Sequence, residues 1–328
     1  MSGYPGFPEP SFVETNGIRM AVYEAGPKDS KYPPIVFCHG FPELAFSWRH
    51  QIRDLGAQGF RVIAPDQRGY GLTPHKGPIE DFDIEHLTAD LIGMLDAKGI
   101  DKCIIVGHDW GGIVSWQIPL RYPQRVAGAI GLNTPFIRRA PIDPIAGMRM
   151  AFGEDMYIVF FQKPGEADKI LDADPEKAMR FFMRLPRASA ISPPPEAAEA
   201  ARRFAFVHLL QDYDPKGDDA QLLNADELAF FTNAFKKTGF TGGINWYRNF
   251  TRNWERSANI KELVEAPSLM IMAELDVVLS PAMADGMEQF VPNLTKHLVK
   301  GSGHWTQQEK PEEVTRVIAD WVRKTFPG

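Results

Sequence analysis

An aspartate flanked by glycines, Asp109, is the residue of this sequence whose surroundings most clearly indicate chemistry. It stands in the run Gly107-His108-Asp109-Trp110-Gly111-Gly112, between an apolar run that predicts a buried strand and a helical pattern. A strand, a turn of the form Gly-x-nucleophile-x-Gly and a helix together make a nucleophile elbow, whose strained turn exposes one side chain. The glycines have a steric purpose, since a Cβ two residues to either side of the nucleophile would collide with the backbone.

A carboxylate in the nucleophile position favours displacement at a saturated carbon. Attack of a carboxylate on an ester or amide would form a reactive anhydride, whereas attack on an sp³ carbon forms an ordinary ester that water can cleave. Asp109 therefore predicts the displacement of an alkoxide or a halide through a covalent ester. The alternative is an incidental acid in a glycine-rich turn, because Gly-x-Asp-x-Gly is common by chance.

The run His39-Gly40-Phe41-Pro42 lies where a loop that stabilises an oxyanion is expected. It follows the apolar run Ile35–Cys38, which predicts an earlier strand. In a fold with a nucleophile elbow, such a loop supplies one backbone N–H and the residue after the nucleophile supplies the other. We therefore expect the N–H groups of Phe41 and Trp110 to face the ester carbonyl.

An acid and a base follow the nucleophile in the order that this type of site requires. Asp276 comes shortly after an apolar run, Ser268–Ala273, and His304 stands in a loop after the last expected strand. The order Asp109…Asp276…His304 is nucleophile, acid and base. Glu274 competes with Asp276 as the acid, and we favour Asp276.

Short apolar runs alternate with helical patterns in the first third and the last quarter of the chain, which predicts a mostly parallel sheet covered on both faces. Helices are expected at Ile84–Lys98, at Asp226–Lys237 and from Pro311 onward. The expected strands are Phe12–Thr15, Arg19–Glu24, Ile35–Cys38, Phe60–Pro65, Ile104–Val106, Ala129–Leu132, Ser268–Ala273 and Lys296–Val299.

Helical and loop patterns without a clear strand interrupt this alternation. They follow Asn133-Thr134-Pro135 and include the triple proline Pro193–Pro195, which predicts a stiff break between helices. The fold class that we predict is α/β, with an α/β-hydrolase core of residues 1–133 and 248–328 and a helical cap of residues 134–247.

Composition narrows the classes of partner. The 328 residues carry a formal net charge of −6 without a basic stripe, so we expect a small uncharged substrate and no nucleic acid. No stretch has the length of a membrane span, and no secretory signal is recognised at the N-terminus. The two cysteines, Cys38 and Cys103, lie in apolar runs and indicate buried thiols in a reducing compartment. We therefore expect a cytoplasmic protein.

These motifs resemble the soluble epoxide hydrolases of the α/β-hydrolase fold, most closely the bacterial and plant forms without an extra N-terminal domain. The resemblance covers nearly the whole chain. One departure is Gln67, where the family usually has leucine. The matching segments are His39–Glu43, Asp66–Gly71, Gly107–Gly112, Gly303–Trp305, Tyr157–Gly165 and Asn245–Asn249.

The resemblance implies an activity and a set of site residues. Tyr157 and Tyr247 match the two cap tyrosines that bind the epoxide oxygen in that family. A phenol suits this task, since it stays protonated at neutral pH and can donate to a developing alkoxide. With Phe41 and Trp110 these tyrosines form the expected substrate site. The expected activity is epoxide hydrolysis in detoxification, and a homodimer is one of the assemblies that stay open. The sequence contains no motif for a metal or a nucleotide, so no metal or other cofactor is expected.

Two other functions remain open at this stage. A haloalkane dehalogenase would use the same nucleophile, but the residue after His39-Gly40 is Phe41 instead of an amide donor, and halide release needs no lid tyrosines. A ligand-binding or scaffolding protein on a hydrolase frame is the second alternative, and an intact set of site residues argues against it. Of the further polar residues, His108 and Tyr213 are expected to have structural roles, and His208 is expected to line the pocket. Glu43 is expected either in the first turn of a helix or as a support of site water.

Overall fold

The computed structural model describes residues 4–186 and 202–327, and its contacts divide the chain into two compact units. The triple proline Pro193–Pro195 lies outside the described residues. Compared with the predicted cap, 134–247, the second unit begins at residue 138, continues to residue 259 and also contains residues 69–84. The first unit is Met1–Arg68, Glu85–Ile137 and Ile260–Gly328, and the second is Gly69–Ile84 and Arg138–Asn259.

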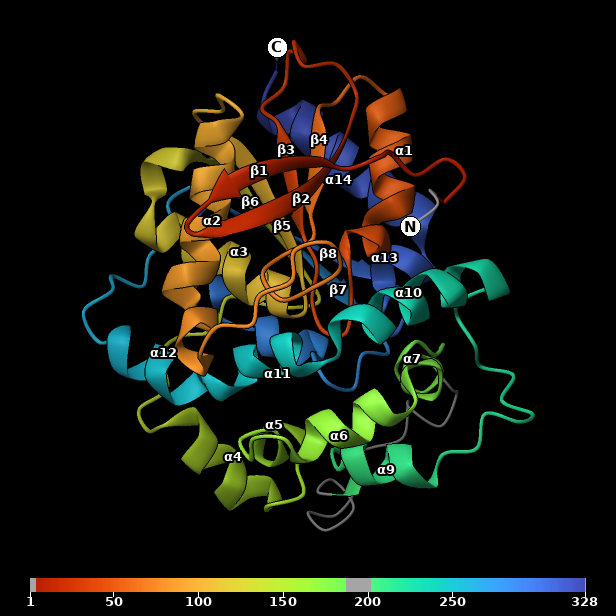
Figure 1. The fold of residues 1–328 in the computed structure, drawn as a ribbon. Coiled ribbons are helices and arrows are strands. Elements are labelled where there is room, and N and C mark those ends of the chain that lie inside the picture. Colours follow the sequence, from red (N-terminus) through yellow and green to blue (C-terminus); the bar gives the residue numbers. More distant parts are fainter. Residues whose placement is uncertain (1–3, 187–201, 328) are drawn as a thin grey trace. The chain divides into compact units, whose positions relative to one another are not determined.

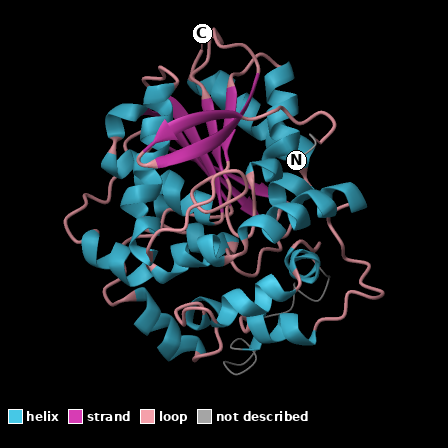
Figure 2. Ribbon diagram, in the orientation of Figure 1, coloured by secondary structure: helices cyan, strands magenta, loops and turns pink. Residues whose placement is uncertain are grey.

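An eight-stranded sheet forms the centre of the first unit (Figures 1 and 2). Its strand order is β1-β2-β4-β3-β5-β6-β7-β8. β2 pairs antiparallel with β1 and β4, and every other neighbouring pair is parallel. The strands are β1 (Ser11–Thr15), β2 (Ile18–Ala25), β3 (Ile35–Cys38), β4 (Val62–Pro65), β5 (Cys103–His108), β6 (Val126–Leu132), β7 (Ser268–Ala273) and β8 (Leu294–Val299).

The central strands are buried on both faces, as continuous apolar runs in a parallel sheet require. All four residues of β3 are fully buried, and so is every residue of β5. The predicted fold class is therefore confirmed. The strands predicted at Ile35–Cys38 and Ser268–Ala273 match β3 and β7, whereas β4 begins at Val62, two residues later than predicted.

Helices cover the two faces of this sheet. Figure 1 shows α2 and α3 on one face and α1 and α14 on the other. α14 begins with a proline, whose missing N–H costs nothing in a first turn, and it ends with two basic residues that suit the negative end of the helix dipole. These helices are α1 (Arg49–Ala57), α2 (Ile84–Ala97), α3 (Trp110–Arg121), α13 (Thr306–Glu309) and α14 (Pro311–Thr325).

The second unit is helical, and its described part contains no strand beyond two isolated bridges, Tyr70 with Thr73 and Arg184 with Gln221. α10 begins at a capping box in which Asn224 and Glu227 each bond the other's backbone N–H, close to the predicted start. No helix in the described residues is long and apolar enough to cross a membrane. The helices are α4 (Pro144–Phe152), α5 (Tyr157–Phe160), α6 (Glu166–Ala173), α7 (Pro175–Phe182), α9 (Phe206–Asp212), α10 (Ala225–Thr238), α11 (Thr241–Arg248) and α12 (Phe250–Arg256).

Close packing against α11 explains why residues 69–84 group with the second unit. A Cβ on Gly242 would lie 2.5 Å from the carbonyl oxygen of Gly69, so the two backbones meet without side chains between them. The ring of Tyr70 meets Trp246 edge to face at 5.3 Å between centroids. The Asn249 amide donates to the carbonyl of Ile79 at 2.6 Å. The loop after β4 is therefore part of the support of α11.

Candidate active site

Asp109 lies in the turn between β5 and α3, in a conformation that residues with side chains rarely adopt. Its φ is 52° and its ψ is −123°. A Cβ on Gly107 would lie 2.0 Å from the carbonyl oxygen of Gly111, and one on Gly111 would lie 2.1 Å from that of Cys38. Both glycines lack a Cβ, so the backbone can pack closely in this turn. The turn places the Asp109 carboxylate at the N-terminus of α3, where the helix dipole favours an anion.

The two carboxylate oxygens of Asp109 have different surroundings. Oδ1 accepts the backbone N–H of Phe41 at 2.7 Å, and Oδ2 lies 3.8 Å from Nε2 of His304. Burial raises the pKa of Asp109, and it is only partly offset by His304, His108 and the backbone N–H groups of Phe41 and Trp110. The structure thus brings both expected oxyanion donors to the carboxylate of the expected nucleophile.

The loop that carries Phe41 is held by the buried histidine His39. Its Nε2 accepts the backbone N–H of Gln67 at 3.0 Å, so its Nδ1 carries the proton and donates to the carbonyl of Gly40. Burial lowers the pKa of His39 to about 4, and the ring is neutral. The Gln67 side chain donates to the His39 carbonyl at 2.6 Å. The glutamine that departs from the family pattern is therefore part of the loop's support.

Asp276 and His304 form a close pair at the carboxyl ends of β7 and β8. His304 Nδ1 donates to Asp276 Oδ2 at 2.9 Å, while Oδ1 accepts the N–H groups of Val278 and Leu279 at 2.9 and 3.0 Å. Burial by itself would raise the pKa of Asp276, but His304 and the N–H donors outweigh it and hold this pKa well below the usual range. The side chain of His304 faces Asp276 on one ring nitrogen and Asp109 on the other.

Two carboxylates raise the pKa of His304. Burial by itself would lower this pKa, but the charge and hydrogen bond of Asp276 and the charge of Asp109 outweigh it and raise the pKa to about 9. At neutral pH the resting His304 is therefore an imidazolium that faces Asp276 on one ring nitrogen and Asp109 on the other.

Two residues that the sequence analysis did not select hold this pair in place. Asn133 donates to Asp276 Oδ2 at 2.7 Å and to the His304 carbonyl at 3.0 Å. Glu309 accepts the N–H groups of the residues before and after His304, at 2.6 and 2.9 Å. A signal for Asn133 existed, since it directly follows a strand beside the elbow strand, where polar residues converge in parallel sheets.

A buried cluster around His108 supports the same loops. His108 Nε2 donates to the carbonyl of His304 at 2.7 Å, and its Nδ1 lies 3.0 Å from Glu43. Glu43 also accepts the Gly40 N–H at 2.6 Å and the Gln307 amide at 2.7 Å. Burial by itself would raise the pKa of Glu43, but His108 and the Gly40 N–H outweigh it and lower this pKa. His108 is hydrogen-bonded on both nitrogens, as the structural reading of the sequence predicts.

The second unit brings Tyr157 and Tyr247 together although ninety positions separate them. Tyr157 opens α5 and Tyr247 lies in the last turn of α11. Their ring centroids are 5.9 Å apart at 74°, and both rings meet Phe161 edge to face. Tyr157 also stacks on Phe206 at 4.7 Å. Two segments of the second unit thus present a compact pair of phenols.

Three residues that the sequence analysis did not favour as catalytic groups make ordinary polar contacts. Glu274 accepts a backbone N–H of the loop after β8 at 2.8 Å, while Asp276 bonds the histidine. His208 pairs with the exposed Asp155 at 3.2 Å. Tyr213 donates to Asp218 at 2.8 Å. These contacts are those of structural residues.

Comparison with known proteins identifies the family of this chain. The family model described as alpha/beta hydrolase fold matches residues 33–311. Epoxide hydrolase A of Mycobacterium tuberculosis is 41% identical over 97% of this chain and 98% of its own length. The crystal structure of epoxide hydrolase A from Mycobacterium thermoresistibile has a TM-score of 0.85 at 40% identity, covering 96% of this chain and 98% of that chain. Epoxide hydrolase VrEH1 from Vigna radiata has a TM-score of 0.83 at 33% identity, covering 98% and 99%. The chain therefore belongs to the alpha/beta hydrolase fold family and, within it, to the epoxide hydrolases.

Proposed function

We propose that this enzyme opens an epoxide with water to a vicinal diol, through an ester on Asp109 that His304-activated water hydrolyses. The observation that carries this proposal is the arrangement of the Asp109 carboxylate. One of its oxygens accepts the Phe41 N–H at 2.7 Å, and the other faces His304 at 3.8 Å. The kinship with epoxide hydrolases supports the choice of substrate.

In the first step, Oδ2 of Asp109 attacks a ring carbon in line with the bond to the ring oxygen. The C–O bond of the ring breaks, and a hydroxyalkyl ester forms on Asp109. Tyr157 and Tyr247 donate hydrogen bonds to the ring oxygen as its negative charge develops. Oδ1 becomes the ester carbonyl and stays on the oxyanion donors of Phe41 and Trp110.

In the second step, His304 takes a proton from water, and this water attacks the Asp109 carbonyl carbon. The Phe41 and Trp110 N–H groups hold the oxyanion until the bond between the carbonyl carbon and Oδ2 breaks. The leaving alkoxide takes its proton from the newly added hydroxyl, so a diol leaves and Asp109 is again a carboxylate. Esterification prepares the base for this step. It removes the charge of Asp109, one of the causes of the raised pKa of His304, so the imidazolium releases its proton more readily. The alkoxide formed by ring opening takes up one proton in the first step, and His304 releases one, so ester formation needs no net proton.

The two half-reactions are expected to respond to pH differently. Ester formation should fall as the pH is lowered, because burial raises the pKa of Asp109 and the protonated acid does not attack. Ester hydrolysis should rise with pH, with a midpoint below the resting His304 pKa of about 9. Single-turnover quench experiments between about pH 5 and 10 separate the two rates. A hydrolysis rate that falls as the pH rises through this range would exclude His304 as the base.

Removing either phenol should slow ring opening and leave ester hydrolysis unaffected. We expect Tyr157→Phe and Tyr247→Phe each to lower the rate of ester formation by about 10²-fold and to leave ester hydrolysis nearly unchanged, because the phenols act as acids only in the first step. Tyr213→Phe, the same change at a tyrosine bonded to Asp218, is the matched control and should keep full activity. Unchanged ester formation in both single variants and in the double variant would refute the role of the tyrosines.

The comparisons do not favour haloalkane dehalogenation. The relatives with similar sequences and folds are named epoxide hydrolases, and two phenols suit an alkoxide better than a halide. We expect no halide release from a panel of chloro- and bromoalkanes. Diol formation from styrene oxide by the purified protein would exclude a function limited to binding or scaffolding.

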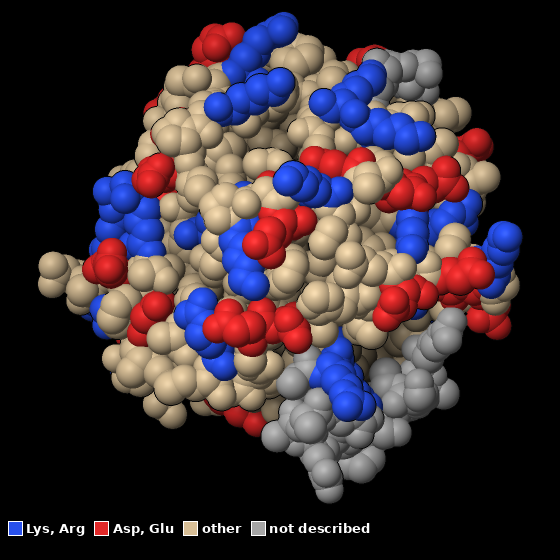
Figure 3. Space-filling model, turned by 60° about the horizontal axis from the view of Figure 1, so that its bottom comes forward, with Lys and Arg blue, Asp and Glu red and all other residues tan. Residues whose placement is uncertain are grey.

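We also propose several features of the enzyme's setting. Free, buried Cys38 and Cys103 support a reducing cytoplasmic location. Blue basic and red acidic residues alternate on the face drawn in Figure 3, and together with the net charge of −6 they support an uncharged small-molecule substrate over nucleic acid. A lid function of the helical insertion, a homodimer and a role in detoxification remain predictions of the sequence.

A further inference from the structure

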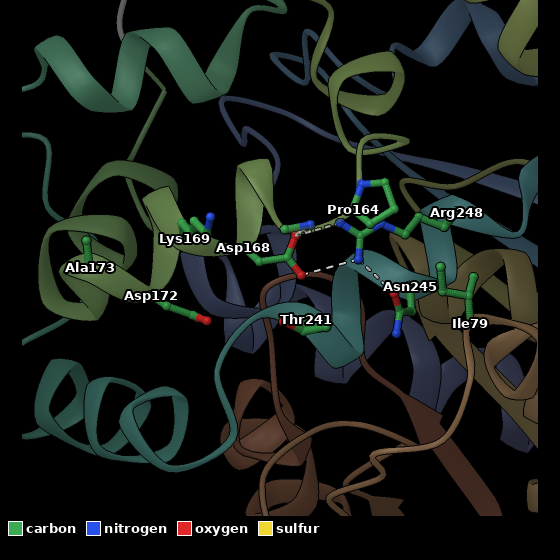
Figure 4. Close-up of a pocket in the computed structure, with 10 residues that line it drawn as sticks. Ile79, Pro164, Asp168, Lys169, Asp172, Ala173, Thr241, Asn245 and Arg248 are labelled. Atoms are coloured by element: carbon green, nitrogen blue, oxygen red, sulfur yellow. Dashed lines mark hydrogen bonds and ion pairs between the residues drawn. The ribbon is translucent and has the colours of Figure 1, made fainter.

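A buried ion pair joins α11, the helix that carries Tyr247, to α6. Arg248 directly follows Tyr247 in α11, and Asp168 lies in α6. The guanidinium makes two parallel contacts with the carboxylate, Nη2 to Oδ2 at 2.5 Å and Nη1 to Oδ1 at 3.2 Å. Figure 4 shows the two side chains facing each other, with dashed lines for the contacts between them. The exposed fractions of the two side chains are 4% for Arg248 and 10% for Asp168, so the pair is largely removed from water.

Arg248 makes further hydrogen bonds, two to the chain that follows Tyr157 and one within α11. Nε donates to the carbonyl of Phe161 at 2.9 Å, and Nη2 donates to that of Lys163 at 3.3 Å. Nη1 donates to the side chain of Asn245 at 2.8 Å. One planar group thus bonds to α6, to α11 and to the turn after α5. Burial by itself would raise the pKa of Asp168, but Arg248 outweighs it and lowers this pKa, so the pair stays charged at neutral pH.

Gln162 forms a second link between the same segments. Its amide donates to the carbonyl of Ile158 in α5 at 2.9 Å and to the carbonyl of Tyr247 in α11 at 3.0 Å. The Gln162 side chain therefore bridges the backbone of Tyr247 and the helix that Tyr157 opens. Gln162 and Arg248 thus both link the chain that follows Tyr157 to α11, and the ring of Phe161 meets both phenols.

We propose that Arg248, Asp168 and Gln162 are positioning residues that hold Tyr157 and Tyr247 at the spacing that ring opening requires. This inference rests on the proposed role of the two tyrosines. Both hydroxyls must reach one oxygen atom, and a misplacement of about 1 Å can cost about 10²-fold in rate. A lysine has one compact ammonium group and cannot reproduce the planar set of bonds that the guanidinium makes.

Arg248→Lys tests this role because it keeps the charge and removes the planar geometry. We expect ester formation to slow by about 10- to 10²-fold, while ester hydrolysis stays within about twofold of wild type. A partly unfolded preparation would behave differently, since it would lower the amplitudes of both half-reactions and leave both rate constants unchanged. Asp168→Asn is a milder second variant that keeps the shape of the side chain and should slow the same step less.

Chemical rescue provides an independent readout. A cavity of about 660 Å³ borders Arg248 and Asp168 and opens to solvent, with Lys169, Thr241 and Asn245 also in its wall (Figure 4). Arg248→Ala should therefore accept free guanidinium beside Asp168. At about 10–50 mM, guanidinium chloride should restore ester formation at least about fivefold, because it supplies the same fork of donors. Sodium chloride at the same concentration should restore nothing.

The control is Arg252→Lys, the same substitution in another ion pair of the second unit. Arg252 lies in α12 and bonds Asp83 at 2.9 Å, and both half-reactions should stay within about twofold of wild type. If the tyrosine-to-phenylalanine variants leave ester formation unchanged, the proposed role of the tyrosines fails first. If those variants slow it and the Arg248 and Asp168 variants do not, only the positioning role is overturned. Equal slowing of both half-reactions, or a failed guanidinium rescue, would also overturn it.

Discussion

Replacing Asp109 with asparagine is expected to lower turnover by at least about 10⁴-fold, since the loss of a catalytic nucleophile typically has an effect of this size or larger. The amide keeps the shape of the side chain and its contact with the Phe41 N–H, but it has no anionic oxygen that could attack carbon. The rate of diol formation by the purified variant measures the effect. Asp320→Asn, at an exposed position of α14, is the control and should keep wild-type activity.

Isotope labelling tests the same step without a mutation. In a single turnover in heavy-oxygen water with enzyme in excess, the diol should carry no label, because its new oxygen comes from Asp109 Oδ2. The label should instead appear in the Asp109 carboxylate, where the attacking water leaves its oxygen. Label in the diol of this first cycle would mean direct attack by solvent, and the ester mechanism would be wrong.

The second large effect is expected for His304→Gln, which should stop the reaction at the ester. A glutamine amide can still donate to Asp276, but it cannot take a proton from water, so hydrolysis should slow by about 10²- to 10⁴-fold. Asp109 still carries its nucleophilic oxygen, so the ester should form and accumulate. Mass spectrometry should find the Asp109 peptide heavier by the mass of one epoxide molecule.

Two controls frame this trapping experiment. The double variant Asp109→Asn, His304→Gln should acquire no adduct, because it lacks the carboxylate that forms the ester. His297→Gln, at a partly exposed histidine that bonds Glu313, should turn over normally. If the His304→Gln variant is inactive and its Asp109 peptide never becomes heavier, the ester has not formed. His304 would then be needed before ester hydrolysis, and its proposed role would be wrong.

Local patterns in the sequence were enough to predict the class of fold and the expected reacting groups. The strand–turn–helix run around Asp109 is a local feature, since its glycines and strained turn depend on residues within a few positions. The carboxyl ends of neighbouring parallel strands meet at one edge of a sheet, so the order Asp109, Asp276, His304 also predicted that these residues lie together. The predicted boundaries of β3 and β7 were accurate because both are short apolar runs bounded by polar or turn residues.

Other parts of the site depend on contacts between distant positions, which no local pattern reports. Asn133 bonds a carboxylate 143 residues away, and Arg248 bonds Asp168 from 80 residues away. The raised pKa of His304 likewise depends on carboxylates that only folding brings near, and their effect outweighs the burial that would lower this pKa. Residues 69–84 join the second unit through the contact of Gly69 with Gly242.

The sequence by itself predicted the nucleophile, its elbow, the order of acid and base, and the alternation of strands and helices, because each prediction depends on residue type and short-range spacing. Only the tertiary structure decided which polar groups support them, how the two phenols are spaced and which protons the resting site holds. The physical reason is that hydrogen bonds and charge interactions act over a few ångströms in space, whatever the separation along the chain.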